Sequence, residues 1–327
     1  MVTPLKHVKE CIDQNRNHSG DNATDIVLPN GNANESDADA QTERTVERIQ
    51  EDNEFIPVIV KRTDEAVRHP DDILEKAIQE GLEQIRRPFL SLALSSVAAG
   101  LILGFTAMSV AVISTMVSAS AGKPLVLRLS TALVYPLGFV ICIMSGTQLF
   151  TEHTATAVYP VLEGKANFFQ LFRLWVVVIL GNMCGAVISA GLLTVADDVI
   201  QAEKGYIIIA HHLLDHGKGA IFISSVLAGW LMAMGGWLIF ATPPTISQIV
   251  CIYIVTFMIG LGGLHHSIAG SVEMFTALFI SNQFTLLQAA RFIGLAITGN
   301  LIGGSIFVAI LNYGHIRKTQ EISNRGE

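Results

Sequence analysis

The chain has 327 residues, of which 50% are hydrophobic and 15% are charged, and its formal net charge is −7 at pH 7. The acidity is confined to one part, because residues 1–88 carry a net charge of −8 whereas residues 89–327 carry +1. It therefore says little about a ligand of the apolar part, and no nucleic-acid partner is expected. The four cysteines are Cys11, Cys142, Cys184 and Cys251. Their isolated spacing predicts neither a disulfide framework nor a metal site.

Two segments precede the apolar part of the chain. Residues 1–60 are rich in Asn, Asp, Glu and Ser, so we expect a disordered acidic N-terminal tail. Pro70, followed by Asp71 and Asp72, suits the first turn of a helix, and the apolar residues beyond them fall on one stripe. This pattern predicts an amphipathic helix over residues 70–87, at the membrane surface or capping the inner mouth of a pore. A solvated linker helix is an alternative of equal weight.

Six apolar runs follow, each long enough to cross a ~30 Å hydrocarbon core at ~20 residues per span. They lie at about 89–118, 127–162, 168–195, 219–241, 246–281 and 288–313. We therefore expect an all-α membrane domain over residues 88–318 and a short cytoplasmic tail over 319–327. Six spans put both termini on one side, and a slight excess of basic residues places that side in the cytoplasm. The N-terminus shows no signal-peptide pattern, so insertion relies on the first span.

The second and fifth runs are interrupted by polar residues and glycines. Gly260–Glu273 places two histidines and a carboxylate at membrane depth, and Ser145–Thr154 interrupts the second run. Polar side chains are tolerated there only where they face protein or a water-filled cavity. A single histidine in a membrane span is as often a hydrogen-bonded core residue beside a helix kink as it is part of a transport path. Paired interruptions in the two halves instead indicate a transport site built from broken helices.

The spans also form an internal repeat. Ser95–Gly100 of the first span matches Ser224–Gly229 of the fourth at five of six positions. Four residues recur in one register in the third and sixth spans: Arg173, Gly181, Asn182 and Gly185, then Arg291, Gly299, Asn300 and Gly303. The repeats cover about 88–197 and 218–313, with three spans each. An odd number of spans turns the second copy upside down, which predicts a 3+3 inverted repeat with spans two and five broken.

The polar residues of the repeat have two expected tasks. We expect Asn182 and Asn300 to hydrogen-bond across helices or to backbone groups freed at the breaks, rather than to touch a permeant. The second half-helix of each break presents free backbone N–H groups and the positive end of its dipole to the centre. These ends favour a small anion or a polarisable acid. Thr151 and Ser267 are the expected hydroxyl donors.

A bare anion in a narrow apolar pore loses hydration at a cost of several kcal/mol. A histidine at the break reduces this cost, because it can give a proton to the anion so that a weak monoacid crosses in its neutral form. His266 is the first candidate for this role, and His265 and His153 rank below it. We expect Glu273 to be a structural partner that orients a neighbour, and Glu152 to pair or cap.

These residues are similar to the motifs of a known family. Leu149–Thr151, His266–Ala269 and the two Gly-Asn pairs, in this order over residues ~86–318, resemble the formate/nitrite transporter family. Gln-Leu-Phe-Thr-Glu and Gly-Ser-Val-Glu look closest to a branch of poorly characterised bacterial inner-membrane proteins. The resemblance implies an aquaporin-like six-helix protomer, a homopentamer with one pore per subunit, and no cofactor. It also implies small monovalent anions such as formate, nitrite, hydrosulfide or lactate, often moved with protons.

The resemblance assigns individual residues as well. The loop threonine of the family falls on Thr151 and its central histidine on His266. Its apolar constrictions fall near Tyr135, Phe139, Phe150 and Ile259. The chain departs from the family pattern at two positions near the central histidine. His265 stands where the family has an acid, and Gly270 stands where it has an asparagine. Gln148 replaces another acid, and the spacing of Lys218 does not suit the outer-vestibule lysine, so the substrate stays open.

The leading hypothesis is a proton-linked channel or transporter for a small monovalent anion or its weak acid. Two alternatives remain. A neutral-solute pore of the aquaporin type is disfavoured because the breaks lack paired Asn-Pro-Ala sequences. A non-conducting membrane scaffold or stress-response protein is the reading in which the departures mark a lost pore. An enzyme is the least expected, since no set of nucleophile, base and orienting group and no phosphate loop is found.

Overall fold

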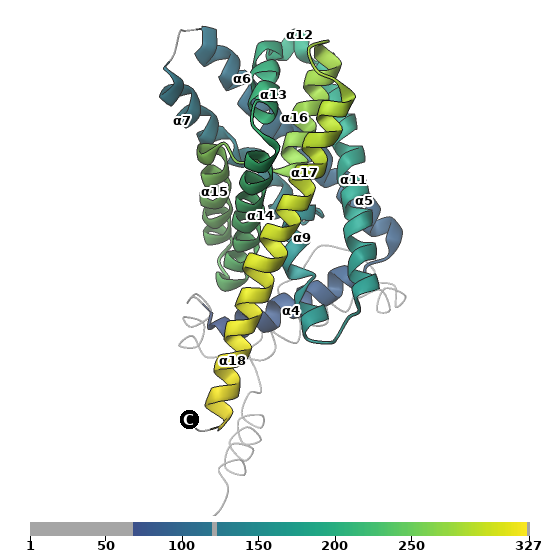
Figure 1. Cartoon of the computed structure of the whole chain (residues 1–327), viewed down its shortest axis with the longest axis vertical. Coiled ribbons are helices and arrows are strands. Elements are labelled where there is room, and N and C mark those ends of the chain that lie inside the picture. The colour runs from purple at the N-terminus through teal and green to yellow at the C-terminus, as the bar shows by residue number, and fades with distance from the viewer. Residues whose placement is uncertain (1–67, 120–122, 326–327) are drawn as a thin grey trace, which may run out of the picture. The chain divides into compact units, whose positions relative to one another are not determined.

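A computed structural model describes residues 68–119 and 123–325 (Figure 1). The tail expected over residues 1–60 lies outside these ranges. Every regular element within them is a helix. In this part of the chain six helical segments are long and apolar enough to cross a membrane: Phe89–Ala119, Pro124–Met144, Phe168–Val195, Lys218–Ala241, Thr245–Gly262 and Leu286–Thr319.

The first half contains two bent spans and one straight one. Its elements are α5 (Phe89–Ile102), α6 (Gly104–Ala119), α7 (Pro124–Val134), α8 (Pro136–Met144), α9 (Phe150–Thr156), α10 (Tyr159–Leu162) and α11 (Phe168–Val195). Pro136 lacks a backbone N–H and separates α7 from α8. A capping box between Asn167 and Gln170 starts α11.

The second half follows two short connecting helices, α12 (Asp197–Ile200) and α13 (Glu203–Leu214). Its elements are α14 (Lys218–Ala241), α15 (Thr245–Gly262), α16 (Ser267–Ile280), α17 (Leu286–Gly304), the π-helix η2 (Ser305–Ile310) and α18 (Leu311–Arg325). The sequence analysis did not predict α13. It also ended the last span at 313, whereas the helix continues through α18 to Arg325, beyond the start of the expected tail at 319.

Two pairs of spans pack closely, α5 against α11 and α14 against α17 (Figure 1). In the first pair, a Cβ added to Gly100 would overlap the backbone carbonyl of Asn182. In the second pair, a Cβ added to Gly229 would overlap the carbonyl of Asn300. Glycine lets helix backbones approach this closely in membranes. The two repeats therefore share one mode of packing, while the inverted orientation of the second copy stays a prediction.

Helix α4 (Pro70–Arg86) packs its apolar face on the membrane domain. His69 accepts a hydrogen bond from the Asp71 N–H, and Arg86 lies in the last turn, which suits the helix dipole. A Cβ added to Gly81 would overlap the carbonyl of Thr156 at the end of α9. Helix α4 also contacts α10, α14 and α18. Its place at a membrane surface stays a prediction.

The C-terminal helix is tied to the loop after α10. Arg317 Nη2 lies 2.8 Å from Glu163 Oε1, and the Tyr313 hydroxyl donates to Glu163 Oε2 over 2.9 Å. Burial alone raises the pKa of Glu163, but the hydrogen bonds from Arg317 and Tyr313 outweigh it, so the pKa lies below the ordinary value. Ser305 of η2 donates to the carbonyl of Thr154 over 2.8 Å, which joins the last span to α9.

Candidate permeation site

Both interrupted spans contain a short non-helical segment between two helices. Helix α8 ends at Met144 and α9 begins at Phe150, whereas α15 ends at Gly262 and α16 begins at Ser267. Gly263 has a φ of 61°, the left-handed conformation that glycine adopts without penalty after a helix end. The chain is therefore broken where the sequence analysis predicted breaks in spans two and five.

A buried asparagine holds the first break. Asn182 Oδ1 accepts from the Phe150 N–H over 2.9 Å, at the first residue of α9. Its Nδ2 donates over 2.8 Å to the carbonyls of Ser96 and Gln148. The side chain therefore satisfies one free N–H and two carbonyls inside the apolar domain, where unpaired backbone groups are expensive.

Asn300 repeats this arrangement at the second break. Its Oδ1 accepts from the Ser267 N–H over 2.8 Å, again at the first residue of the following helix. Its Nδ2 donates to the carbonyl of Ser225 over 2.7 Å and to that of His265 over 3.1 Å. Ser96 and Ser225 occupy matching positions of the repeat, so the two asparagines make equivalent contacts.

The two breaks meet through one side-chain hydrogen bond. His266 Nε2 lies 2.8 Å from Thr151 Oγ1, and both residues are buried. His266 Nδ1 accepts from the Ala269 N–H over 3.2 Å, so this nitrogen carries no hydrogen. The neutral ring therefore holds its hydrogen on Nε2 and donates it to Thr151.

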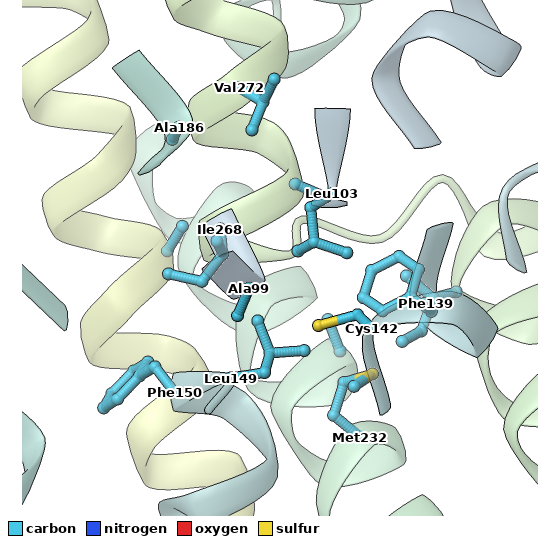
Figure 2. Packing of buried hydrophobic residues seen from close by; sticks show 14 of the residues in the cluster. Ala99, Leu103, Phe139, Cys142, Leu149, Phe150, Ala186, Met232, Ile268 and Val272 are labelled. Atoms are coloured by element: carbon cyan, nitrogen blue, oxygen red, sulfur yellow. The ribbon is translucent and has the colours of Figure 1, made fainter. Parts of the chain in front are cut away.

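Apolar side chains surround this contact. The rings of Phe139 and His266 make a T-shaped contact with their centroids 4.9 Å apart. The ring centroids of Tyr135 and Phe139 are 5.2 Å apart. Ile259 and Phe150 are completely buried. Figure 2 shows Phe139, Phe150 and their neighbours within one apolar cluster. The polar contact is therefore enclosed by hydrocarbon.

A cavity of about 280 Å³ leads to His266. Its wall includes the predicted residues Tyr135, Ile259 and His266, and also Glu273. Phe139, Phe150, Thr151, Ser267 and His265 are buried beside it without being part of the wall. The remaining lining is mainly apolar, with Arg128, Thr131 and His212 among the polar exceptions.

His265 faces away from the contact between the breaks. Its Nδ1 lies 2.7 Å from Ser224 Oγ on α14. Its ring stacks on that of His212 of α13, with centroids 5.8 Å apart and planes inclined by 8°. The ring of His216 lies 6.0 Å from it. His265 is therefore part of a cluster of three histidines, with His212 and His216.

Two residues that the sequence analysis did not single out brace the second break. Arg128 of α7 donates over 2.6 Å to each of the carbonyls of Leu261 and Gly262, the last residues of α15. His212 Nε2 lies 3.1 Å from the Gly263 carbonyl, to which it donates. Cations suit the carbonyl end of a helix. The apolar spacing of Tyr206, Ile209, Ala210 and Leu213 is the sequence signal for α13, the helix that carries His212.

The position of His212 affects its titration. Helix α13 is not one of the six spans. Partial burial lowers the pKa of His212, and His216 and Arg128 lower it further, while the hydrogen bond to Gly263 and the charge of Asp215 oppose them. His212 therefore tends to stay neutral at neutral pH.

Several buried polar groups near the breaks have no hydrogen-bond partner within the described residues. They are Gln148 Oε1, Ser267 Oγ, both ring nitrogens of His153, and His265 Nε2. Within the described residues, the carboxyl groups of Glu152 and Glu273 make no hydrogen bond or ion pair. The expected roles, pairing or capping for Glu152 and orienting a neighbour for Glu273, stay predictions. No group of three or more potential metal ligands is found within the described residues. Cys142, Cys184 and Cys251 are free thiols.

Comparison with known proteins decides the family. The model for "Formate/nitrite transporter" matches residues 71–314, which is most of the chain and includes both breaks. This chain belongs to the formate/nitrite transporter family. It is thus a multi-pass membrane protein in which the six apolar segments are membrane spans.

Relatives within the formate/nitrite transporter family include proteins of several names. "Inner membrane protein YfdC" of Escherichia coli (strain K12) is 29% identical over 258 residues, covering 78% of this chain and 81% of that protein. "Formate channel FocA" of Haemophilus influenzae is 27% identical over 252 residues, covering 69% and 86%. Both alignments span most of the membrane domain.

Two solved structures share the fold. An "FNT family ion channel" has a TM-score of 0.66 at 21% identity and covers 75% of this chain and 99% of that one. A "Pentameric formate channel with formate bound" has a TM-score of 0.58 at 21% identity and covers 69% and 96%. At this level of identity, the likeness concerns the fold.

One departure from the formate/nitrite transporter pattern has a packing explanation. Gly270 lies where the family resemblance placed an asparagine, and a Cβ added there would stand 2.7 Å from the ring of Phe292. The Phe292 ring of α17 is fully buried and lies 5.9 Å from that of His265. Phe292 therefore occupies the space that a larger side chain at position 270 would need.

Proposed function

We propose that this formate/nitrite transporter carries a small monovalent anion or its weak acid, with formate and nitrite as the first candidates, and that a proton moves with it. One observation supports this most directly. The hydrogen bond between His266 and Thr151 joins the two breaks at the base of the cavity, in otherwise apolar surroundings. The relatives named as formate channels support the substrate class.

The geometry gives the permeant a defined set of donors. His266 Nε2–H and the Thr151 hydroxyl face each other, and the unpartnered Ser267 hydroxyl lies one residue away. An oxygen of a small acid can take the place of Thr151 as the acceptor from His266. These donors recover part of the hydrogen bonding that the permeant loses on leaving water.

The apolar ring around the donors favours the protonated permeant. Phe139 and Ile259 offer no charge, and desolvating a bare anion here costs several kcal/mol. Transfer of a proton to the permeant removes most of this cost, so one proton crosses with each anion. His266 is the polar group that the permeant must pass.

We also propose a homopentamer in the bacterial inner membrane with both termini in the cytoplasm. Two features support the assembly: the fold likeness to a pentameric channel and the exposed apolar side chains along the spans. Phe168, Phe169 and Leu180 on α11 are more than half exposed, and hydrocarbon or a neighbouring subunit would cover them. Native mass spectrometry in detergent counts the subunits, and a monomer would contradict this part.

The test of the function is a flux measurement in liposomes. Uptake of formate, nitrite, acetate and hydrosulfide is followed at about pH 5 and about pH 7, together with internal pH. We expect the wild type to carry at least one of these acids with a proton. We expect His266→Ala and Thr151→Val each to change the rate about tenfold or more, which corresponds to ~1.4 kcal/mol at the barrier.

The control and the contrary outcomes are distinct. Thr298→Val alters an exposed threonine that bonds only within its own helix, and we expect unchanged flux. Equal rates for the wild type and His266→Ala would contradict the role of the histidine. Flux of water or glycerol without anion flux would indicate a neutral-solute pore, and no flux of any solute would indicate a non-conducting scaffold.

A further inference from the structure

The cavity above His266 contains a carboxyl group that has no structural partner. Glu273 follows His266 by seven residues in α16, which is about two helical turns, or ~10 Å, along the same face. Its side chain lines the cavity and is only 4% exposed. Among the described residues, its carboxyl group makes neither a hydrogen bond nor an ion pair. Burial without a partner favours the neutral form of a carboxyl group.

His266 is a poor proton donor in the observed arrangement. Its Nδ1 accepts from the Ala269 N–H, and its Nε2–H is donated to Thr151. A second proton on this ring would require Nδ1 to give up its backbone partner. The ring can therefore offer a hydrogen bond to the permeant, but the proton that neutralises the permeant has to come from elsewhere.

The other charged or titratable groups of the cavity are either engaged by backbone carbonyls or much weaker acids than a carboxyl group. Besides Glu273 and His266, the lining includes Arg128, Tyr135 and His212. Arg128 and His212 donate to carbonyls at the second break. Tyr135 is a phenol, a much weaker acid than a carboxyl group. Five other elements packed against α16 contribute no charged or titratable side chain to the lining: α5, α6, α9, α11 and α17.

We propose that Glu273 is the proton donor to the permeating anion. The proposal rests on the proposed function and names the group that performs its proton step. The O–H bond of the Glu273 carboxyl breaks and a new O–H bond forms on an oxygen of the anion, which becomes a neutral acid while Glu273 becomes a carboxylate. A proton from the outer solution, passing along the cavity, then restores the carboxyl group.

A local proton donor changes how flux depends on pH. Without Glu273, the flux follows the neutral acid already present in bulk solution, which falls about tenfold for each pH unit above the pKa of the permeant. With Glu273, the anion is protonated inside the cavity, so the flux falls less steeply. The difference in flux between the protein with Glu273 and a variant without this carboxyl group is therefore largest at neutral pH.

The experiment compares Glu273→Gln with the wild type in liposomes that contain a pH-sensitive dye, with formate as the permeant. We expect Glu273→Gln to lose about tenfold in rate near pH 7 and little near pH 5. Glu273→Asp keeps the carboxyl group, so it should keep the shallow pH profile at a lower rate. Glu203→Gln removes an exposed carboxylate of α13 that is not part of the cavity wall, and it should match the wild type.

The outcomes separate the two proposals. If the wild type carries formate and Glu273→Gln shows the same rates and proton uptake, or a faster rate at both pH values, the role of Glu273 is overturned while the function stands. If the wild type carries no acid, both proposals fail.

A second measurement covers the case in which Glu273→Gln does not assemble. Infrared difference spectra of the wild type on addition of formate should then show loss of a protonated carboxyl band. That band should shift in Glu273→Asp and be unchanged in Glu203→Gln. Absence of such a band in the wild type would overturn the proposal.

Discussion

At the first break, Asn182 satisfies one N–H and two carbonyl groups, and at the second break Asn300 does the same with the matching atoms. The surroundings differ. Leu149 caps α9 without a side-chain hydrogen bond, whereas His266 caps α16 with its ring. Helix α9 has 7 residues and α16 has 14. Equivalent asparagine contacts therefore support both breaks, but only the second break has an imidazole at the start of its following helix.

The second break has further supporting contacts. Arg128 donates to the last two carbonyls of α15 and His212 donates to the carbonyl of Gly263, while Ser224 accepts from the His265 N–H over 3.2 Å. The segment that carries His266 is therefore fixed on two sides, by Asn300 within the domain and by these residues at the mouth. Fixed supporting contacts are what a precise functional geometry requires.

The largest expected effect comes from removing the shared scaffold. Asn182→Leu and Asn300→Leu each remove three buried hydrogen bonds. Each variant leaves one N–H and one carbonyl at the break without a partner, at about 1–3 kcal/mol per group. We expect either variant to lose several kcal/mol and to assemble poorly, which thermal denaturation in detergent and size-exclusion chromatography measure. Thr298→Val, on the exposed face of α17, serves as the control. A stable Asn182→Leu beside an unstable Asn300→Leu would break the equivalence of the two breaks.

An intermediate effect is expected from the glycines behind the asparagines. Gly100→Ala and Gly229→Ala each place a Cβ against the carbonyl of the asparagine that holds the break. Forced separation of close-packed helices typically costs about 1–3 kcal/mol, so both variants should lower the melting temperature to a similar extent. Gly294→Ala is the control, because no atom lies within 4 Å of its added Cβ. Two unequal losses would show that the repeats do not pack alike.

The smallest expected effect is a pH response confined to the second break. The pKa of His212 is lowered in the folded protein, so its contribution to stability is present above the ordinary histidine value of about 6.5 and is lost as pH falls through the lowered pKa. Because the His212 side chain is only partly buried and solvent screens its charge, we expect less than about 1 kcal/mol. The protection factors for hydrogen exchange in α13 and at Gly263, which are corrected for the intrinsic pH dependence of exchange, should therefore fall on acidification. The protection factors at the first break should not change.

His212→Gln provides the matched variant for that measurement. Its amide can still donate to the Gly263 carbonyl, but it does not titrate. The protection factors in this variant should be independent of pH between about 7.5 and 5.5. An unchanged acid response would assign the effect to His265 or His216 instead.

Hydropathy and glycine spacing predict much of this fold. The six spans follow from apolar runs of sufficient length, and the breaks follow from polar residues and glycines at membrane depth. The register shared by Gly181-Asn182 and Gly299-Asn300 indicates equivalent roles for the two asparagines. These inferences depend on local composition and on repetition, which a single sequence displays directly.

The parts that could not be predicted depend on contacts between distant segments. Arg128 lies more than 130 positions from the carbonyls to which it donates, and no local pattern links them. Helix α13 resembles a polar loop because Lys204 and two histidines dilute its apolar stripe. The histidines could be proposed as site residues, but the engagement of both nitrogens of His266 depends on Ala269 and Thr151 in three dimensions.

The contact between Thr151 and His266 has a consequence for the energy economy of the cell. Thr151 is 0% exposed and His266 is 1% exposed, and their side chains are hydrogen-bonded to each other. While this bond is intact, a continuous file of water cannot pass between them. Such a file would conduct protons and dissipate the electrochemical gradient across the membrane. On the proposed function, this hydrogen bond between the two breaks would keep the resting pore closed to protons, and it would give way only to a molecule that can replace the bond it breaks.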